Sequence, residues 1–220
     1  MSKASTPSRR PARRRADRWA AGRRLLRATD PRMAELVDAQ PSLDPDRLFD
    51  GLPSDLWGAL VLQVIGQQLS LASAAAILSR LEALRGGRMP TPAEVLATDA
   101  ETLRGIGLSY AKASYLHDLA ERLVDGRLDL DHLRALDDDG ARDALTEIRG
   151  VGRFTADGAL MLALRRPDVW PAADLALRRA VERNWGLDPP ASVEQVDALG
   201  ERFRPWRTLA AAYLYSSVEP

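Results

Sequence analysis

Apolar residues recur along most of the chain at the three- and four-residue spacing of an amphipathic helix. Alternating apolar and polar runs are few and no Asn-Gly hairpin signal occurs, so the pattern predicts no sheet. Capping residues and glycines bound the runs, with capping boxes at Thr91 and Ser192. The expected helices cover residues 31–40, 56–67, 71–85, 110–125, 131–136, 138–148, 153–165, 174–185, 193–203 and 205–217, with further short turns at 92–101. The pattern therefore predicts an all-α protein.

Two local features are less regular. Residues 41–53 read as a connector, after which Ser54 is the expected N-cap of the most apolar helix. Thr98 is the expected cap of a second capping box, ending at Glu101.

Composition places the chain among soluble globular proteins. It has 220 residues, 45% hydrophobic and 28% charged. No apolar run approaches the ~18 residues of a membrane span, and the basic N-terminus lacks the apolar stretch of a secretory signal. The absence of cysteine excludes disulfides, thiolate zinc sites, cysteine nucleophiles and iron–sulfur clusters, and two histidines are too few for a histidine-rich metal site. We expect a cytoplasmic protein.

Charge is distributed unevenly along the chain. Residues 1–32 hold eleven basic and two acidic residues, whereas residues 33–220 carry a net charge of −9. A basic arm on an acidic body favours a polyanionic partner, with a solvated tail as the alternative. The Ser, Pro and Arg content of residues 1–16 predicts disorder there. Lysine occurs only at Lys3 and Lys112.

A glycine hairpin joins two of the predicted helices at Gly150-Val151-Gly152. Glycines allow positive φ and close backbone approach, and Val151 can fill the gap between the helices. Backbone N–H groups at the start of the next helix can then bind a phosphate without net positive charge. The alternative is an ordinary helix–helix turn, and the similar Gly105-Ile106-Gly107 shows that the pattern is common.

Asp174 follows about twenty residues after the hairpin, at a predicted helix start. Alone it is explained as an N-cap. Its place after the hairpin makes it a candidate catalytic carboxylate.

Four blocks together resemble the helix–hairpin–helix DNA glycosylase superfamily, and within it the bacterial 3-methyladenine DNA glycosylase II branch. The blocks are VIGQQLSLASAA (64–75), GLSYAKASYL (107–116), LTEIRGVGRFTA (145–156) followed by Asp174, and RPWRTLA (204–210). They occur in the family order and extend over roughly residues 50–215. Longer members carry an N-terminal β-rich domain, for which this chain has no room.

The resemblance implies two helical lobes with an active-site cleft between them. One lobe would be residues 50–166, carrying the hairpin, and the other residues 17–49 joined to 167–220, with residues 1–16 as a basic disordered arm. The partner would be double-stranded DNA with alkylated bases, gripped through the backbone by Gly150, Val151, Gly152, Arg153 and Thr155. We expect a monomer without membrane contact.

By the same resemblance Asp174 would stabilise the positive charge that develops on the sugar when the base leaves, and would orient the attacking water. Members that also nick the strand place a lysine after the Gly-x-Gly-x of the hairpin, where this chain has Phe154. The expected enzyme is therefore monofunctional. It would need no cofactor, although a monovalent cation could bridge the hairpin to a DNA phosphate.

The flipped base would stack on aromatic side chains. Candidates are Phe154, Trp170, Tyr213 and Tyr215, of which the two tyrosines cannot share one helix face. Trp57, Trp185 and Trp206 are expected in the core. Gln68, with Leu69 beside it, is the candidate wedge that fills the gap left by the base.

Gly158 admits two explanations. In the first, the missing side chain leaves the pocket wide, so that 3-methyladenine, 7-methylguanine and bulkier lesions are accepted. In the second, it lets another helix pack closely. Two other functions also stay open: a non-enzymatic helix–hairpin–helix DNA-binding module, and a glycosylase for oxidised or mismatched bases.

Overall fold

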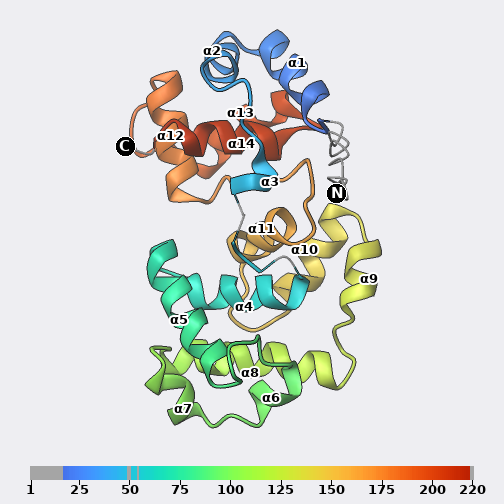
Figure 1. The fold of residues 1–220 in the computed structure, drawn as a ribbon. Helices are drawn as coiled ribbons and strands as arrows, with labels where there is room; N and C mark the ends of the chain where they lie inside the picture. The colour runs from blue at the N-terminus through green and yellow to red at the C-terminus, as the bar shows by residue number, and fades with distance from the viewer. Residues whose placement is uncertain (1–16, 49–50, 54, 219–220) are drawn as a thin grey trace, which may run out of the picture.

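The computed structural model describes residues 17–48, 51–53 and 55–218. The predicted basic arm, residues 1–16, lies outside these residues. The described part is helical and contains no strand, which confirms the all-α prediction (Figure 1). No helix in it is long and apolar enough to cross a membrane. Its elements are α1 (Ala20–Thr29), α2 (Pro31–Ala39), α3 (Pro45–Leu48), α4 (Leu56–Gly66), α5 (Leu71–Ala83), α6 (Pro92–Leu96), α7 (Ala100–Gly105), α8 (Tyr110–Val124), α9 (Leu130–Ala135), α10 (Asp138–Thr146), α11 (Arg153–Leu162), α12 (Leu175–Trp185), α13 (Val193–Gly200), the 3-10 turn Glu201–Phe203 and α14 (Arg207–Ser216).

Local capping chemistry explains most of the helix starts. Asp30 accepts hydrogen bonds from two N–H groups of α2, and Thr91 and Ser192 form the expected capping boxes. Two expected caps were misplaced by one residue: Asp55 caps α4 and Asp99 caps α7, because a carboxylate accepts an N–H bond there. The connector at residues 41–53 also contains the short helix α3, which the pattern did not predict.

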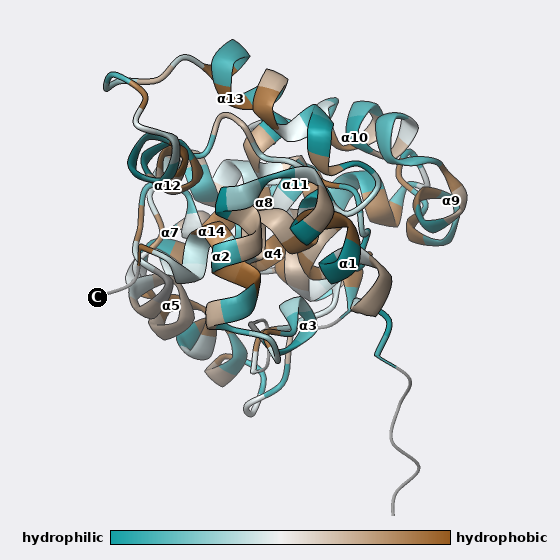
Figure 2. Cartoon of the chain, turned by 90° about the horizontal axis from the view of Figure 1, so that it is seen from above, coloured by the Kyte–Doolittle hydropathy of each residue, from teal (hydrophilic) through white to brown (hydrophobic). Residues whose placement is uncertain are grey.

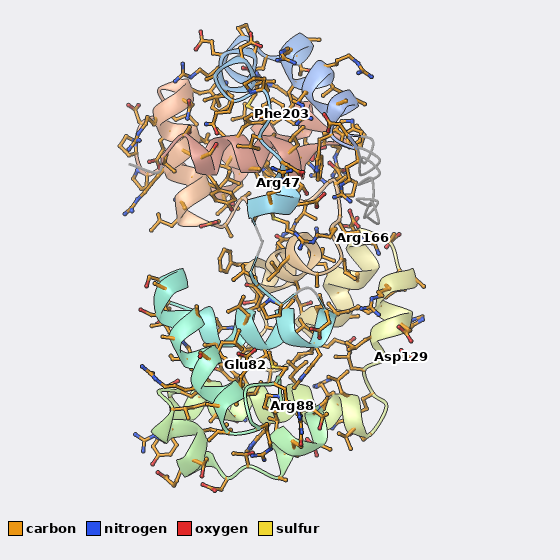
Figure 3. The ribbon with its side chains drawn as sticks, in the orientation of Figure 1. Arg47, Glu82, Arg88, Asp129, Arg166 and Phe203 are labelled. Atoms are coloured by element: carbon orange, nitrogen blue, oxygen red, sulfur yellow. The ribbon has the colours of Figure 1, made fainter. Side chains whose placement is uncertain are left out.

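The helices pack in two groups (Figure 1). In the upper group, α1, α2, α12 and α14 pack together, with α3 against α14. The lower group is built on α4, which packs against α5, α8 and α11, with α6 and α7 against α8. Side chains fill both groups: Phe203 lies in the upper one, and Glu82 and Arg88 lie in the lower one (Figure 3).

The core follows the most apolar helix. Nine of the eleven residues of α4 are buried, and hydrophobic residues mark this helix near the middle of the molecule in Figure 2. A helix that is apolar on all sides must be covered on all sides. Because α11 and α5 cover α4, the hairpin before α11 and the turn after α4 are fixed relative to each other.

A buried ion pair holds the two helices of the hairpin together. Arg142 of α10 donates from Nε to Asp157 of α11 at 2.8 Å, with side-chain exposures of 9% and 2%. Burial raises the pKa of Asp157 although Arg142 opposes that shift. Removing one partner of such a pair leaves a buried charge unpaired, which costs on the order of 3–5 kcal/mol.

Candidate active site

A cleft of about 570 Å³ lies between the two helix groups. Its lower side comes from α4, α11 and the turn after α4, and its upper side from α14 and the start of α12. Most of the lining is apolar, including Leu62, Met161, Leu162, Pro171 and Ala212. A concave apolar site with a few polar groups is typical of a ligand pocket.

Asp174 lies in this cleft as the N-cap of α12. Its Oδ1 accepts the N–H of Ala176 at 2.9 Å, and its Oδ2 accepts the hydroxyl of Tyr215 at 2.5 Å. Burial, and next the negative charge of Asp174, raise the pKa of Tyr215 well above its usual value of 10. Tyr215 therefore remains a hydrogen-bond donor, and the carboxylate is fixed through both oxygens.

The hairpin presents free backbone N–H groups to solvent. Gly152 caps α11 without any side-chain hydrogen bond, and within the described residues no bond reaches the N–H groups of Gly152, Arg153 or Phe154. A Cβ at Gly152 would meet no atom within 4 Å. The start of α11 is thus open to an anionic ligand such as a phosphate.

Gly150 has a different reason to be glycine. Its φ is +79°, and a Cβ there would overlap the ring of Tyr115. Between the glycines, the Val151 side chain is 4% exposed and belongs to the hydrophobic core. The hairpin is therefore fixed on its inner side and open on its outer side.

The comparisons with known proteins agree with this geometry. The family model of the HhH-GPD superfamily base excision DNA repair proteins matches residues 61–205. The chain belongs to the HhH-GPD superfamily. DNA-3-methyladenine glycosylase 1 of Schizosaccharomyces pombe is 30% identical over 194 residues, 87% of this chain and 84% of that protein. The solved structure of the S. pombe 3-methyladenine DNA glycosylase in complex with abasic DNA superposes with a TM-score of 0.81 at 28% identity, covering 90% of this chain and 96% of that one.

The chain does not span every relative to the same extent. The Bacillus subtilis protein YfjP is 29% identical over 174 residues, which are 76% of this chain but 61% of that protein. The family match at residues 61–205 contains the hairpin, Asp174 and the cleft lining from α4 and α11, whereas Tyr215 lies outside it.

Two aromatic residues predicted for the HhH-GPD base pocket do not line it. Trp170 is 2% exposed and donates its indole N–H to the carbonyl of Val196. Tyr213 is fully buried and donates its hydroxyl to the carbonyl of Gln40. Both belong to the core of the upper group. Tyr215 and Phe154, which is 46% exposed, do line the cleft.

Thr155 also differs from the prediction. Its side chain is 4% exposed, and its hydroxyl accepts a hydrogen bond from Gln67 at 3.3 Å. The side chain thus faces α4, so a contact of Thr155 with a DNA phosphate would have to come from its backbone N–H. The buried Val151 side chain likewise leaves only its backbone for such a contact.

Gly158 lies in the cleft, but it does not leave the space empty. A Cβ at this position would lie 2.6 Å from the side-chain amide of Gln63 on α4. Gly158 lines the cleft, as the first explanation requires, and the Gln63 side chain occupies part of the space beside it. The second explanation also fits, because α4 packs on α11 at this point, and the range of accepted bases stays a prediction.

The turn from α4 to α5 carries the candidate wedge. Leu69 is 41% exposed at the edge of the cleft, and Gln68 is exposed with a φ of +59°. A non-glycine residue in this conformation is uncommon and needs a surrounding structure that holds it. Leu69 lines the cleft and Gln68 precedes it on the exposed turn, and that either of them enters DNA stays a prediction.

Lys112 and Gln67 hold this turn, a role that the sequence did not reveal. Lys112 donates from Nζ to the carbonyls of Ile65 and Gln67, both at 2.7 Å, and burial lowers its pKa. Gln67 in turn donates from Nε2 to the carbonyl of Gly150 at 2.7 Å. The wedge turn and the hairpin are therefore connected directly.

Proposed function

We propose that the chain is a monofunctional DNA glycosylase that removes alkylated bases, including 3-methyladenine and 7-methylguanine, from double-stranded DNA. The observation that carries the proposal is Asp174, held through both oxygens in an apolar cleft that Phe154, next to the open hairpin, also lines. Membership of the HhH-GPD superfamily and the likeness to the S. pombe 3-methyladenine DNA glycosylase support the same reaction.

Base excision breaks the bond between the sugar C1′ and the base through an oxocarbenium-like transition state. A carboxylate that is already fixed in direction stabilises that positive charge. An alkylated base that is already cationic leaves readily and needs little acid catalysis. The target base is taken out of the stack into the cleft, while the hairpin N–H groups contact the DNA backbone.

The lysine distribution supports a reaction without strand cleavage. Phe154 occupies the position where strand-nicking members place an amine. The one lysine of the described residues, Lys112, is bound to the carbonyl ends of α4 and does not line the cleft. Without an amine beside the sugar no Schiff base forms there. Two statements stay predictions: that the reaction needs no cofactor, and that a monovalent cation can bridge the hairpin to a DNA phosphate.

The direct test is release of free base from methylated duplex DNA, identified by chromatography. Wild-type protein is expected to release alkylated bases and leave abasic sites that break only after alkali treatment. Asp174→Asn is expected to lower the rate by about 10²–10³-fold, because a preorganised charge is lost. Since asparagine is also a good N-cap, the fold and DNA binding should persist.

Other outcomes would point to the other functions. DNA binding without any base release would indicate a binding module. Release of oxidised or mismatched bases but not of methylated ones would change the substrate class. Near-normal turnover by Asp174→Asn would remove this residue from the mechanism.

A further inference from the structure

One polar side chain of the cleft has no hydrogen-bond partner in the described part of the chain. Five polar side chains line the cleft, and four are bound within the protein: Gln67, Asp174, Tyr215 and Ser216. Within the described residues, the amide of the fifth, Gln63, makes no hydrogen bond. Since the polar atoms of this half-buried residue are not enclosed by the protein, water can reach them while the cleft is empty.

The orientation of this amide is set by Gly158. A Cβ built on Gly158 lies 2.6 Å from each of Cδ, Oε1 and Nε2 of Gln63. A point equally distant from these three atoms lies over the face of the amide plane. The face of the amide thus packs on Gly158, and its donor and acceptor lie side by side along the cleft surface.

A base that enters the cleft displaces the water around this amide. An amide left unpaired in that state costs about 1–3 kcal/mol, so a base that pairs with it is favoured over one that does not. A glutamine amide matches the N6 amino group and N7 of adenine, through one accepted and one donated hydrogen bond. Guanine presents two acceptors on the same edge, and 7-methylation blocks one of them.

We propose that Gln63 is a specificity-determining residue whose amide binds the N6 and N7 edge of a flipped adenine lesion. Gly158 is required for this role because only glycine leaves room for the amide. This inference rests on the proposed glycosylase function. The contact with Gln63 would favour 3-methyladenine, in which N6 and N7 are both free, over 7-methylguanine.

The experiment measures kcat/KM for release of 3-methyladenine and of 7-methylguanine by the full chain. The variant Gln63→Leu nearly keeps the volume of the side chain and removes its amide. Release of 3-methyladenine is expected to fall about tenfold and that of 7-methylguanine by less than about threefold. Gly158→Ala retains Gln63 but displaces its amide, and is expected to shift the ratio in the same direction. Gln40→Leu, the same change at a residue outside the cleft, should leave the ratio unchanged.

The outcomes separate the two proposals. If wild-type protein releases no methylated base, the proposed function has failed. If wild type is active and both variants of the Gln63–Gly158 pair keep its substrate ratio, Gln63 does not recognise the base. An equal loss for both bases in folded variants, checked by thermal unfolding, would also overturn the proposal, because it would indicate packing rather than recognition.

Discussion

The Asp174 carboxylate is held by one backbone N–H and one tyrosine hydroxyl, so its direction does not depend on the bound base. The N–H bond comes with the helix start, whereas the tyrosine bond comes from α14, 41 residues away in sequence. A charge that is fixed before the reaction needs little reorganisation when the sugar becomes positive. Tyr215 is therefore a positioning residue in the proposed mechanism.

Tyr215→Phe tests this role by removing one hydroxyl. A hydrogen bond to a charged group contributes roughly 1.5–3 kcal/mol, so the single-turnover rate of base release should fall about 10- to 100-fold. Since the pKa of Tyr215 is raised above 10, its ionisation should cause no loss of wild-type activity below about that pH.

Tyr213→Phe is the matched control, because it removes the same atom two residues earlier on α14. The Tyr213 hydroxyl bonds the Gln40 carbonyl in the core, so this change should lower the melting temperature without lowering the rate. Equal rates for Tyr215→Phe and wild type would show that Asp174 does not need the tyrosine.

At the scale of elements, the two glycines of the hairpin are required for different reasons. Gly150 needs its positive φ and the space taken by the Tyr115 ring, whereas Gly152 has an ordinary φ of −89° and open surroundings. Gly150→Ala should therefore destabilise the fold by about 2 kcal/mol or more. Gly152→Ala should destabilise the fold less, by up to about 1 kcal/mol because alanine is a poorer N-cap, and yet bind DNA more weakly, because its methyl group separates the N–H groups from a phosphate.

The measurement is a pair of unfolding curves together with binding to several undamaged duplexes. Phosphates carry no sequence information, so the affinity of Gly152→Ala should fall alike on all of them. Unchanged affinity in this folded variant would make the hairpin a structural turn only.

Elements with local signals could be predicted from the sequence, and tertiary contacts could not. Capping boxes and the apolar run of α4 are encoded within a few residues, so these helices were placed correctly. The spacing of Tyr213 and Tyr215 shows that they face different ways, but the packing of α14 decides which one enters the cleft. Gln63 depends on Gly158, 95 positions later, and no local pattern connects them.

At the scale of the whole molecule, a chain without net charge has to approach a polyanion. The body after residue 32 carries −9, so long-range attraction to DNA does not come from its overall charge. The hairpin contributes neutral N–H groups, with the exposed Arg149 and Arg153 beside them. Phe154, two residues after Gly152, also lines the cleft, so the cleft and the hairpin adjoin at the start of α11.

Variants of the basic arm would show how much of the attraction to DNA comes from residues 1–16. Residues 1–16 contain six basic residues and no acidic one. If they contact phosphates, binding releases counterions, and deleting them should reduce the slope of log Kd against log salt concentration by up to about 5. A full-length variant with the six basic residues changed to glutamine should behave like the deletion, because charge and not length is responsible. The slope is measured on an undamaged duplex, and base release at low salt serves as a check that the site is intact. The same slope in wild type and in both variants would show that the arm takes no part in DNA binding.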